Sequence, residues 1–290
     1  MTQQPAGTSL VYGRGVTDIR LVVPASTHEV QIGADCVTKR YRSWGRGEPQ
    51  REWSALALLG EHLPGLAPVP LEARLDAVPP TIVMQRLPGQ PVGTKPVDAA
   101  QLDAVVTALD HLHAGIPSEV VARLPPRIWH PAATLAEVRA WLARCPSVGG
   151  HPAVRAARTA STEWLGQPAL DAVMLAGEPV LGRADGNLAN HLWDGRVVRL
   201  VDFEDSGRSD RVFEVADVVE HLATRAAGVE PDQLLDRFTF DRTEVGRLRE
   251  HRRLFATFWF LMLLPGGPAA ARNPPGTLER QANHLLDLFA

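Results

Sequence analysis

The strongest constraint on the fold is a change of pattern at Leu87-Pro88-Gly89, where strand-like alternation gives way to helical periodicity. Before this break, short β-rich runs surround a single helical segment, and after it apolar residues recur mostly at helical spacing. Strands and helices do not alternate regularly, which argues against a doubly wound parallel sheet. We therefore expect an α+β protein with two lobes: a small antiparallel sheet with one helix in residues 1–87, and a larger, mainly helical lobe in residues 88–290. The hinge falls at about residues 84–90.

Alternation and turn residues predict the elements of the first lobe. A hairpin turn is expected at Gly33-Ala-Asp35. A helix is expected from Pro49, which suits a first helical turn, to Leu59, and Pro64-Gly65 ends it. The expected strands are Ile19–Val23, His28–Ile32, Cys36–Tyr41, Val69–Leu75 and Thr81–Met84.

In the second lobe, one β-rich stretch from Val180 to Phe203 interrupts the helical pattern. Thr134 and Glu137 have the spacing of a capping box, which predicts a helix start at Thr134, ahead of the run Val138–Leu142. The other expected helices are Gln101–His113, Ala153–Leu165 and those from Val212 onward.

The composition is that of an ordinary globular protein, with 45% apolar and 22% charged residues among 290. A net charge of −3 gives no reason to expect nucleic acid or an anionic membrane as a partner. The longest apolar run, Phe255–Leu264, is about half of the ~20 residues that a membrane span needs, so we expect a buried helix. There is no signal-sequence pattern at the start, and Cys36 and Cys145 make no disulfide framework. These features predict a cytoplasmic monomer or homodimer.

The segment Gly182-Arg-Ala-Asp-Gly-Asn-Leu-Ala-Asn190 carries the most chemical information. Asp185 and Asn190 share one loop, and Asp202 ends a strand that a tight turn at Asp194-Gly195 returns to that loop. Two carboxylates and an amide therefore converge, and such oxygen ligands suit Mg²⁺ together with substrate phosphates. In phosphoryl transfer, one carboxylate orients the attacking hydroxyl while other groups hold the metal. Taken singly, Asp185 and Asn190 could equally well cap turns.

This pattern, Asp185-x-x-x-x-Asn190 followed by Asp202-Phe-Glu, resembles the catalytic loop and metal-binding segment of aminoglycoside phosphotransferases and choline kinase-like enzymes, which have a bilobal protein-kinase-like fold. The resemblance implies that Asp185 is the catalytic base and that Asn190 and Asp202 bind Mg²⁺. It implies transfer of the γ-phosphoryl group of ATP, or of GTP as an alternative donor, to a hydroxyl of a small molecule. Residues 207–216 are similar to the downstream part of the family pattern.

At one position the chain departs from the family pattern. The family has a histidine two residues before the catalytic aspartate, and this chain has Arg183 there. Arg183 could brace the loop by pairing with a carboxylate, or it could contact the substrate. The departure also leaves open a catalytically weak, nucleotide-binding pseudokinase.

A kinase also needs a cation on the α- and β-phosphates, held by a carboxylate from the neighbouring helix. Lys39 lies on a predicted strand, and Glu52 follows on the predicted helix. Among 30 basic residues only Lys39 and Lys95 are lysines, so an ammonium at position 39 suggests a chemical need. The alternative is an ordinary surface lysine.

The resemblance also places the nucleotide contacts. Met84 would lie behind the adenine, at the end of the last predicted strand of the first lobe. The loop between the first two predicted strands would touch the phosphates, with Gly13-Arg-Gly15 as a competing site. The candidates are the backbone of Gln85, Arg86 and Leu87 for adenine, and Ser26 and Thr27 for phosphate.

Acids outnumber bases just beyond the metal-binding segment. From Asp202 to Glu220 there are seven acids and two bases, which favours a cationic acceptor such as an aminoglycoside or related antibiotic. Asp205 is the best candidate for contact with that acceptor. Two alternatives stay open: acids also favour helix starts for structural reasons, and the acceptor could be a metabolite of the choline, amino-alcohol or sugar type.

Overall fold

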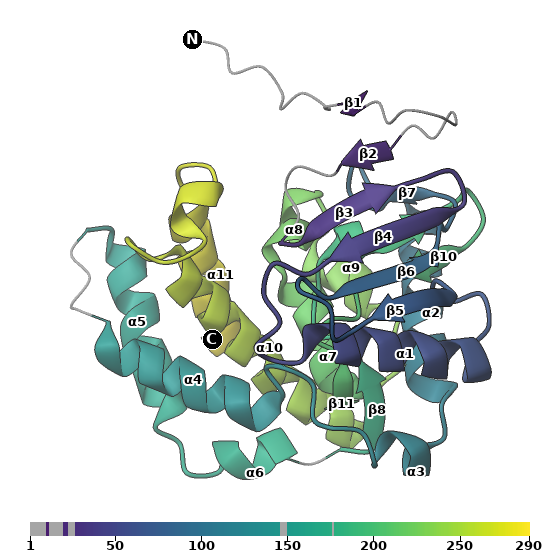
Figure 1. Ribbon diagram of the computed structural model, residues 1–290. Helices are drawn as coiled ribbons and strands as arrows, with labels where there is room; N and C mark the ends of the chain where they lie inside the picture. Colours follow the sequence, from purple (N-terminus) through teal and green to yellow (C-terminus); the bar gives the residue numbers. More distant parts are fainter. Residues whose placement is uncertain (1–9, 12–19, 23–26, 146–149, 176) are drawn as a thin grey trace.

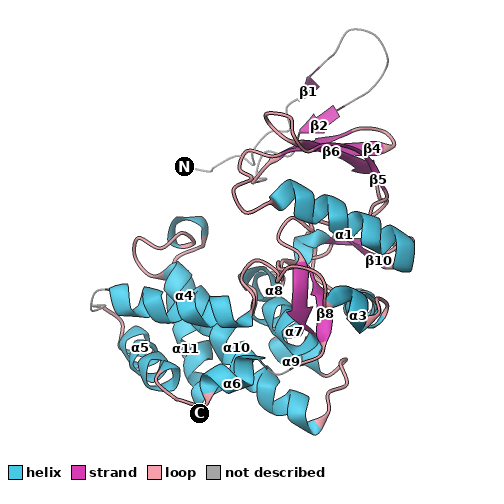
Figure 2. Ribbon diagram, turned by 60° about the horizontal axis from the view of Figure 1, so that its bottom comes forward, coloured by secondary structure: helices cyan, strands magenta, loops and turns pink. Residues whose placement is uncertain are grey.

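The computed structural model describes residues 10–11, 20–22, 27–145, 150–175 and 177–290. One antiparallel sheet lies at the upper right of Figure 1 with a single long helix beneath it, and most later helices lie below and to the left. Figure 2 shows the same division from a second direction. The expected α+β class, a small sheet with one helix followed by a mainly helical part, is confirmed. The lobe boundary at residues 87 and 88 and the hinge stay predictions.

The sheet has six strands in the order β1-β2-β3-β4-β6-β5, and all neighbours are antiparallel. The predicted hairpin joins β3 to β4, and the Gly33 amide donates to the Cys36 carbonyl (2.8 Å). Helix α1 (Glu48–His62) packs against β5 and β6 and begins with Pro49 in its first turn. The strands are β1 (Leu10–Val11), β2 (Arg20–Val22), β3 (Glu29–Ile32), β4 (Cys36–Arg40), β5 (Pro70–Arg74) and β6 (Thr81–Gln85).

Two small sheets follow the Pro-Gly break. In one, β9 (His191–Trp193) lies between β7 (Gln90–Pro91) and β10 (Val198–Leu200). In the other, β8 (Pro179–Gly182) pairs with β11 (Gly207–Asp210). Three of these strands, β8, β9 and β10, form the β-rich interruption that the sequence predicts, whereas β7 and β11 were not predicted. The turn at Asp194-Gly195 joins β9 to β10, with Gly195 at φ +98°, a conformation that glycine adopts without a steric penalty.

Helices make up most of the remaining chain. The predicted helix start at Thr134 was wrong, because Pro131 opens the helix one turn earlier with its fixed φ. The Thr134 hydroxyl instead donates to the Trp129 carbonyl (2.6 Å). The helices are α2 (Ala99–Ala114), α3 (Ser118–Val121), α4 (Pro131–Arg144), α5 (Pro152–Leu165), α6 (Leu170–Leu175), α7 (Arg211–Glu220), α8 (Leu222–Ala226), α9 (Pro231–Leu235), α10 (Arg242–Leu263), α11 (Thr277–Phe289), and the 3₁₀ turns η1 (Leu188–Asn190) and η2 (Ala270–Arg272).

Buried apolar residues of both parts join in one continuous core. Helix α10 lies at its centre, between α7 and α11, and carries the apolar run at 255–264. Phe255 and Phe260 are buried, as predicted, whereas Phe258 and Trp259 are only partly buried. In the described part of the chain, no helix has the length and apolar character to cross a membrane.

Candidate active site

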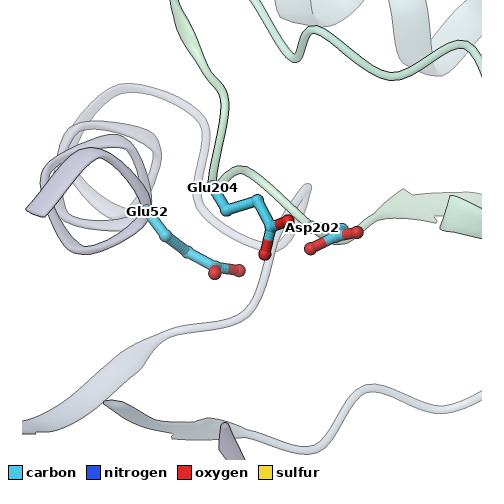
Figure 3. A group of neighbouring side chains, drawn as sticks. All are labelled: Glu52, Asp202 and Glu204. Atoms are coloured by element: carbon cyan, nitrogen blue, oxygen red, sulfur yellow. The ribbon is translucent and has the colours of Figure 1, made fainter. Parts of the chain in front are cut away.

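Lys39 lies among three carboxylates. Strand β4 places it between β3 and β6, with its side chain nearly buried. Its Nζ atom is 2.7 Å from Glu52 Oε2, 2.6 Å from Asp202 Oδ1 and 2.5 Å from Glu204 Oε2. Figure 3 shows the three carboxylates turned toward one another, Glu52 from α1 and the other two from the segment after β10. The structure thus brings Lys39 and Glu52 together and excludes an ordinary surface lysine.

Three carboxylates share one ammonium, and their pKa values reflect this. Burial raises the pKa of Asp202 to about 6. The positive charge of Lys39 lowers this pKa, but the negative charges of Glu204 and Glu52 add to the effect of burial. Burial also acts on Glu204, but His28 and Lys39 together lower the pKa of Glu204 to about 2. The pKa of Lys39 is raised because the carboxylates, Glu52 first, outweigh its burial. The cluster has excess negative charge, and its oxygens lie within 4.8 Å of one another, which fits a divalent cation.

His28 and Glu204 belong to this cluster, although sequence reasoning did not assign either a role. His28 directly precedes β3, and its Nε2 atom is 2.9 Å from Glu204 Oε2. Its Nδ1 atom accepts the Arg42 amide (3.1 Å), which leaves the proton on Nε2 toward Glu204. The available signal for Glu204 was its position two residues after Asp202, in the segment Asp202-Phe-Glu.

The loop after β8 holds Asp185 and Asn190 in contact. Asn190 Nδ2 donates to Asp185 Oδ2 (2.7 Å), and the Asn187 amide donates to Asp185 Oδ1 (2.9 Å). The Asn190 carbonyl accepts the Val201 amide (3.1 Å), so this loop lies beside Asp202. Asp202 has φ +69°, an uncommon conformation for a residue other than glycine and one that is often retained at functional sites. The three residues that the sequence singled out therefore lie in one place.

A buried network of ion pairs supports the loop that holds Asp185 and Asn190, and the sequence did not predict this network. Arg127 is 2% exposed and donates to Glu214 and to Asp217 Oδ2 (2.8 Å). Glu214 in turn accepts the Arg183 amide (3.0 Å), which fixes the backbone just before Asp185. Arg127 lies in an irregular segment 58 residues before Asp185, so no local pattern links the two.

Among the residues that the structure describes, no carboxylate pairs with the Arg183 side chain, so the interpretation that Arg183 braces the loop through a carboxylate was wrong. Its guanidinium is buried, with Nη2 3.4 Å from His191 Nε2. In the described part of the chain, its Nε and Nη1 atoms have no hydrogen-bond partner. Burial lowers the pKa of Arg183, while the charges of Asp185 and Asp202 oppose this. At 2% exposure, the side chain could contact a substrate only if the loop moved.

His221 is a further neighbour of Asp185 that sequence reasoning did not find. It precedes α8, and its Nδ1 atom accepts the Ala223 amide (3.1 Å). Its Nε2 atom therefore carries the proton, 3.7 Å from Asp185 Oδ1. Burial lowers the pKa of His221 to about 4 despite the charge of Asp185, so the ring is neutral near pH 7.

At the predicted hinge, most amides are already engaged. Met84 is buried, the Gln85 amide donates to Val69 (2.8 Å), and the Arg86 amide donates to Asp35 (2.9 Å). The Leu87 amide has no hydrogen bond within the described residues. Of the predicted phosphate contacts, Thr27 is exposed before β3, while Ser26 and Gly13-Arg-Gly15 lie outside the described residues.

The acids between Asp202 and Glu220 form ion pairs within the molecule. Asp205, the predicted acceptor contact, lies 3.2 Å from Arg46, and burial raises its pKa to about 6. Basic residues distant in sequence supply most of the other partners. The pairs are Asp202 and Glu204 with Lys39, Asp210 with Arg247, Glu214 and Asp217 with Arg127, and Glu220 with Arg225, Arg252 and His284. The excess of acids in the sequence is therefore weak support for a cationic acceptor.

Residues 27–251 match the phosphotransferase enzyme family. A search of the curated proteins found no match. A choline/ethanolamine kinase family protein from Mesorhizobium loti is similar in structure, with a TM-score of 0.61 and 16% identity over 95% of this chain and 88% of its own. A macrolide 2'-phosphotransferase from Brachybacterium faecium gives a TM-score of 0.55 and 17% identity, covering 91% and 90%. A spectinomycin phosphotransferase complex with ADP and spectinomycin gives 0.53 and 12%, covering 97% and 88%. These likenesses confirm the protein-kinase-like fold.

Proposed function

The chain belongs to the phosphotransferase enzyme family, and on that premise we propose that it transfers the γ-phosphoryl group of ATP, with Mg²⁺, to a hydroxyl of a small molecule. One observation carries the proposal: a connected set of contacts runs from Lys39 to Asp185. Lys39 lies 2.6 Å from Asp202, and the Val201 amide, next to Asp202, donates to the Asn190 carbonyl (3.1 Å). The Asn190 side chain in turn donates to Asp185. The phosphate-binding cation, the metal ligands and the base of a phosphotransferase would thus lie in one connected set of contacts.

In this proposal Asp185 accepts the proton of the acceptor hydroxyl. Both of its oxygens take one hydrogen bond each, and the side chain is 37% exposed, so it remains open to a hydroxyl. Asp202 and Asn190 would hold Mg²⁺, with the Glu204 carboxylate next to them. When bound, the metal would neutralise charge on the phosphates. Lys39 would leave Asp202 and Glu204 for the α- and β-phosphates and keep its contact with Glu52.

The nucleotide would lie between the sheet and the helical part. Met84 would cover the adenine, and the hydrogen bonds would fall mainly to Leu87, because the amides of Gln85 and Arg86 already have partners. Similar solved structures hold ADP or GDP, which supports a purine nucleotide as donor. We propose ATP as the donor, with GTP as an alternative.

For the acceptor, we propose an antibiotic or a related hydroxylated small molecule. Structures similar to this chain include phosphotransferases named for aminoglycosides, spectinomycin and macrolides, which supports this class. A metabolite of the choline type is the second candidate, because the similar structures also include a choline kinase and a choline/ethanolamine kinase family protein. A cationic aminoglycoside remains a narrower form of the first proposal.

The test is Asp185→Asn in the purified protein with Mg·ATP and a panel of hydroxylated acceptors. Turnover, measured as the mass gain of one phosphoryl group, should fall at least ~100-fold because the base is lost. Affinity for Mg·ATP should change less than threefold. Asp76→Asn, in an exposed turn, is the matched control and should leave turnover unchanged. Retained turnover in Asp185→Asn would refute the role of Asp185. Binding of Mg·ATP with no phosphorylation of any acceptor would instead favour the pseudokinase.

A further inference from the structure

Four aromatic side chains extend in an unbroken series from the predicted catalytic base. His221 Nε2 lies 3.7 Å from Asp185, and the His221 ring meets Trp259 edge-on at 4.6 Å. Trp259 contacts Phe258 at 5.3 Å between ring centroids. Phe258 stacks on Trp141 at 5.6 Å and meets Trp129 at 6.0 Å. We call the four residues Trp129, Trp141, Phe258 and Trp259 the aromatic wall.

The aromatic wall is not simply part of the core. Its four side chains are only partly buried, although they stand on α4, α10 and the segment before α4, beside fully buried neighbours such as Phe255 and Phe260. Helix α4 packs against α10 (Figure 2). Large aromatic side chains that line up on one half-exposed face are typical of ligand-binding surfaces.

Two further features of the wall point to a ligand. Trp129 has φ +56°, which is a genuine outlier for so bulky a residue and places the ring against Trp141 and Phe258. The Trp259 Nε1 atom is buried and has no hydrogen-bond partner in the described part of the chain, although buried indole N–H groups usually find one. A ligand acceptor oxygen near His221 would supply that partner.

The surroundings of the wall disfavour a polycation. Asp205, Asp217 and Glu220 of the acidic run 202–220 are already paired with arginines. Burial and the positive charges of Arg127 and Arg208 lower the pKa of His130, which follows Trp129. Arg46 pairs with Asp205, whose carbonyl accepts the Ile128 amide (2.9 Å), so a further arginine is linked to the residue before Trp129.

We propose that the aromatic wall binds the acceptor, and that the acceptor carries a flat apolar face, such as an aromatic or fused ring system, next to the hydroxyl that is phosphorylated. The face would stack on the wall, and the hydroxyl would reach Asp185 beside the His221 N–H. This inference rests on the proposed function, since it takes Asp185 as the reacting end of the site. It replaces charge with ring stacking as the main source of acceptor recognition.

The experiment uses the full chain with 5-fluorotryptophan in place of its seven tryptophans, loaded with Mg·AMP-PNP. The ¹⁹F resonances are assigned by single Trp→Phe variants. Two probes are titrated: indole-3-ethanol, a hydroxyl on a flat apolar ring, and 2-deoxystreptamine, a cationic polyol without such a face. Indole-3-ethanol should shift the resonances of Trp129, Trp141 and Trp259 and bind at least tenfold more tightly than 2-deoxystreptamine. The resonances of Trp53 and Trp164 should stay in place.

Tighter binding of 2-deoxystreptamine, or no shift of the wall resonances with either probe, would overturn the inference. Trp129→Leu and Trp141→Leu should each weaken binding of indole-3-ethanol about tenfold, whereas Trp141→Phe, which keeps a ring, should stay within threefold. Trp53→Phe is the control and should not change binding. Asp185-dependent turnover of polycations with no binding at the wall would reject this inference alone. Binding at the wall with no Asp185-dependent turnover would reject the proposed function alone.

Discussion

Lys39 occupies the position among Glu52, Asp202 and Glu204 where a divalent cation would meet the same oxygens. The ammonium therefore competes with metal as long as no phosphate draws it away. Sequence reasoning could predict Lys39 and Glu52, because a rare lysine on a strand and a helical glutamate have recognisable spacing. It could not predict His28 or Glu204, because their contact depends on how the segment before β3 lies over the segment after β10.

This competition leads to a prediction for Lys39→Met, which keeps the length of the side chain and removes its charge. The variant should bind Mg²⁺ without nucleotide, because three close carboxylates are left without an ammonium. Thermal unfolding should show a higher Tm with 10 mM Mg²⁺ for Lys39→Met and little change for the wild type. Lys95→Met, at the exposed second lysine, is the control and should behave as the wild type. An unchanged Tm of Lys39→Met with Mg²⁺ would show that the cluster is no cation site.

At the scale of elements, helix α7 anchors the loop that holds Asp185 through the buried Arg127–Glu214–Asp217 network. Helix existence was predictable from periodicity over α2, α5 and α7, whereas the start of α4 was not. In α4, Thr134 and Glu137 have the spacing of a capping box, but the helix begins earlier, at Pro131. The Arg127–Glu214–Asp217 network could not be predicted from the sequence either. Arg127 meets its partners only because the irregular segment in which it lies packs against α7, far along the chain.

Arg127→Met should be strongly destabilising because it leaves two buried carboxylates without a cation. At pH 8 we expect a loss of about 3–5 kcal/mol in the free energy of unfolding. Burial already raises the pKa of Asp217 to about 6 beside Arg127, whereas Arg127 helps to keep the pKa of Glu214 low. Without Arg127 both pKa values should rise, so the folded variant binds protons more readily than the folded wild type. Its deficit relative to the wild type should therefore shrink as pH falls from 8 to 5. Urea unfolding at several pH values measures this.

The control for that experiment is Arg139→Met, which removes an arginine whose partner, Asp171, is largely exposed. It should change stability little at any of these pH values, because solvent screens an exposed pair. A pH-independent deficit in Arg127→Met would mean that packing of the side chain, rather than its charge, supports the loop.

At the scale of the whole molecule, several contacts between the helical part and the part with the sheet and α1 fall on one short segment, residues 200–206. The Leu200 amide donates to the Leu66 carbonyl (2.8 Å), Asp202 binds Lys39, and the Ser206 carbonyl accepts from Arg51 (3.0 Å). The two-part division was predictable from the Pro-Gly break. The gathering of these three contacts on one segment was not predictable, because each contact joins residues more than a hundred positions apart.

Arg51 offers a way to test whether this segment couples the two parts. Its Nη1 atom donates to the carbonyls of Ser206 and Pro126 (2.9 Å), so Arg51→Met leaves two acceptors without this donor and should cost about 1–2 kcal/mol in the free energy of unfolding. Hydrogen exchange should speed up around residues 126–128 and 203–208 and stay unchanged in α10, which packs in the core far from α1. Because Lys39 and Asp202 meet at the same segment, Mg·ADP should restore most of the lost protection. Faster exchange spread evenly over α10 and α11 would mean instead that Arg51 supports the whole fold and that the segment is no separate joint.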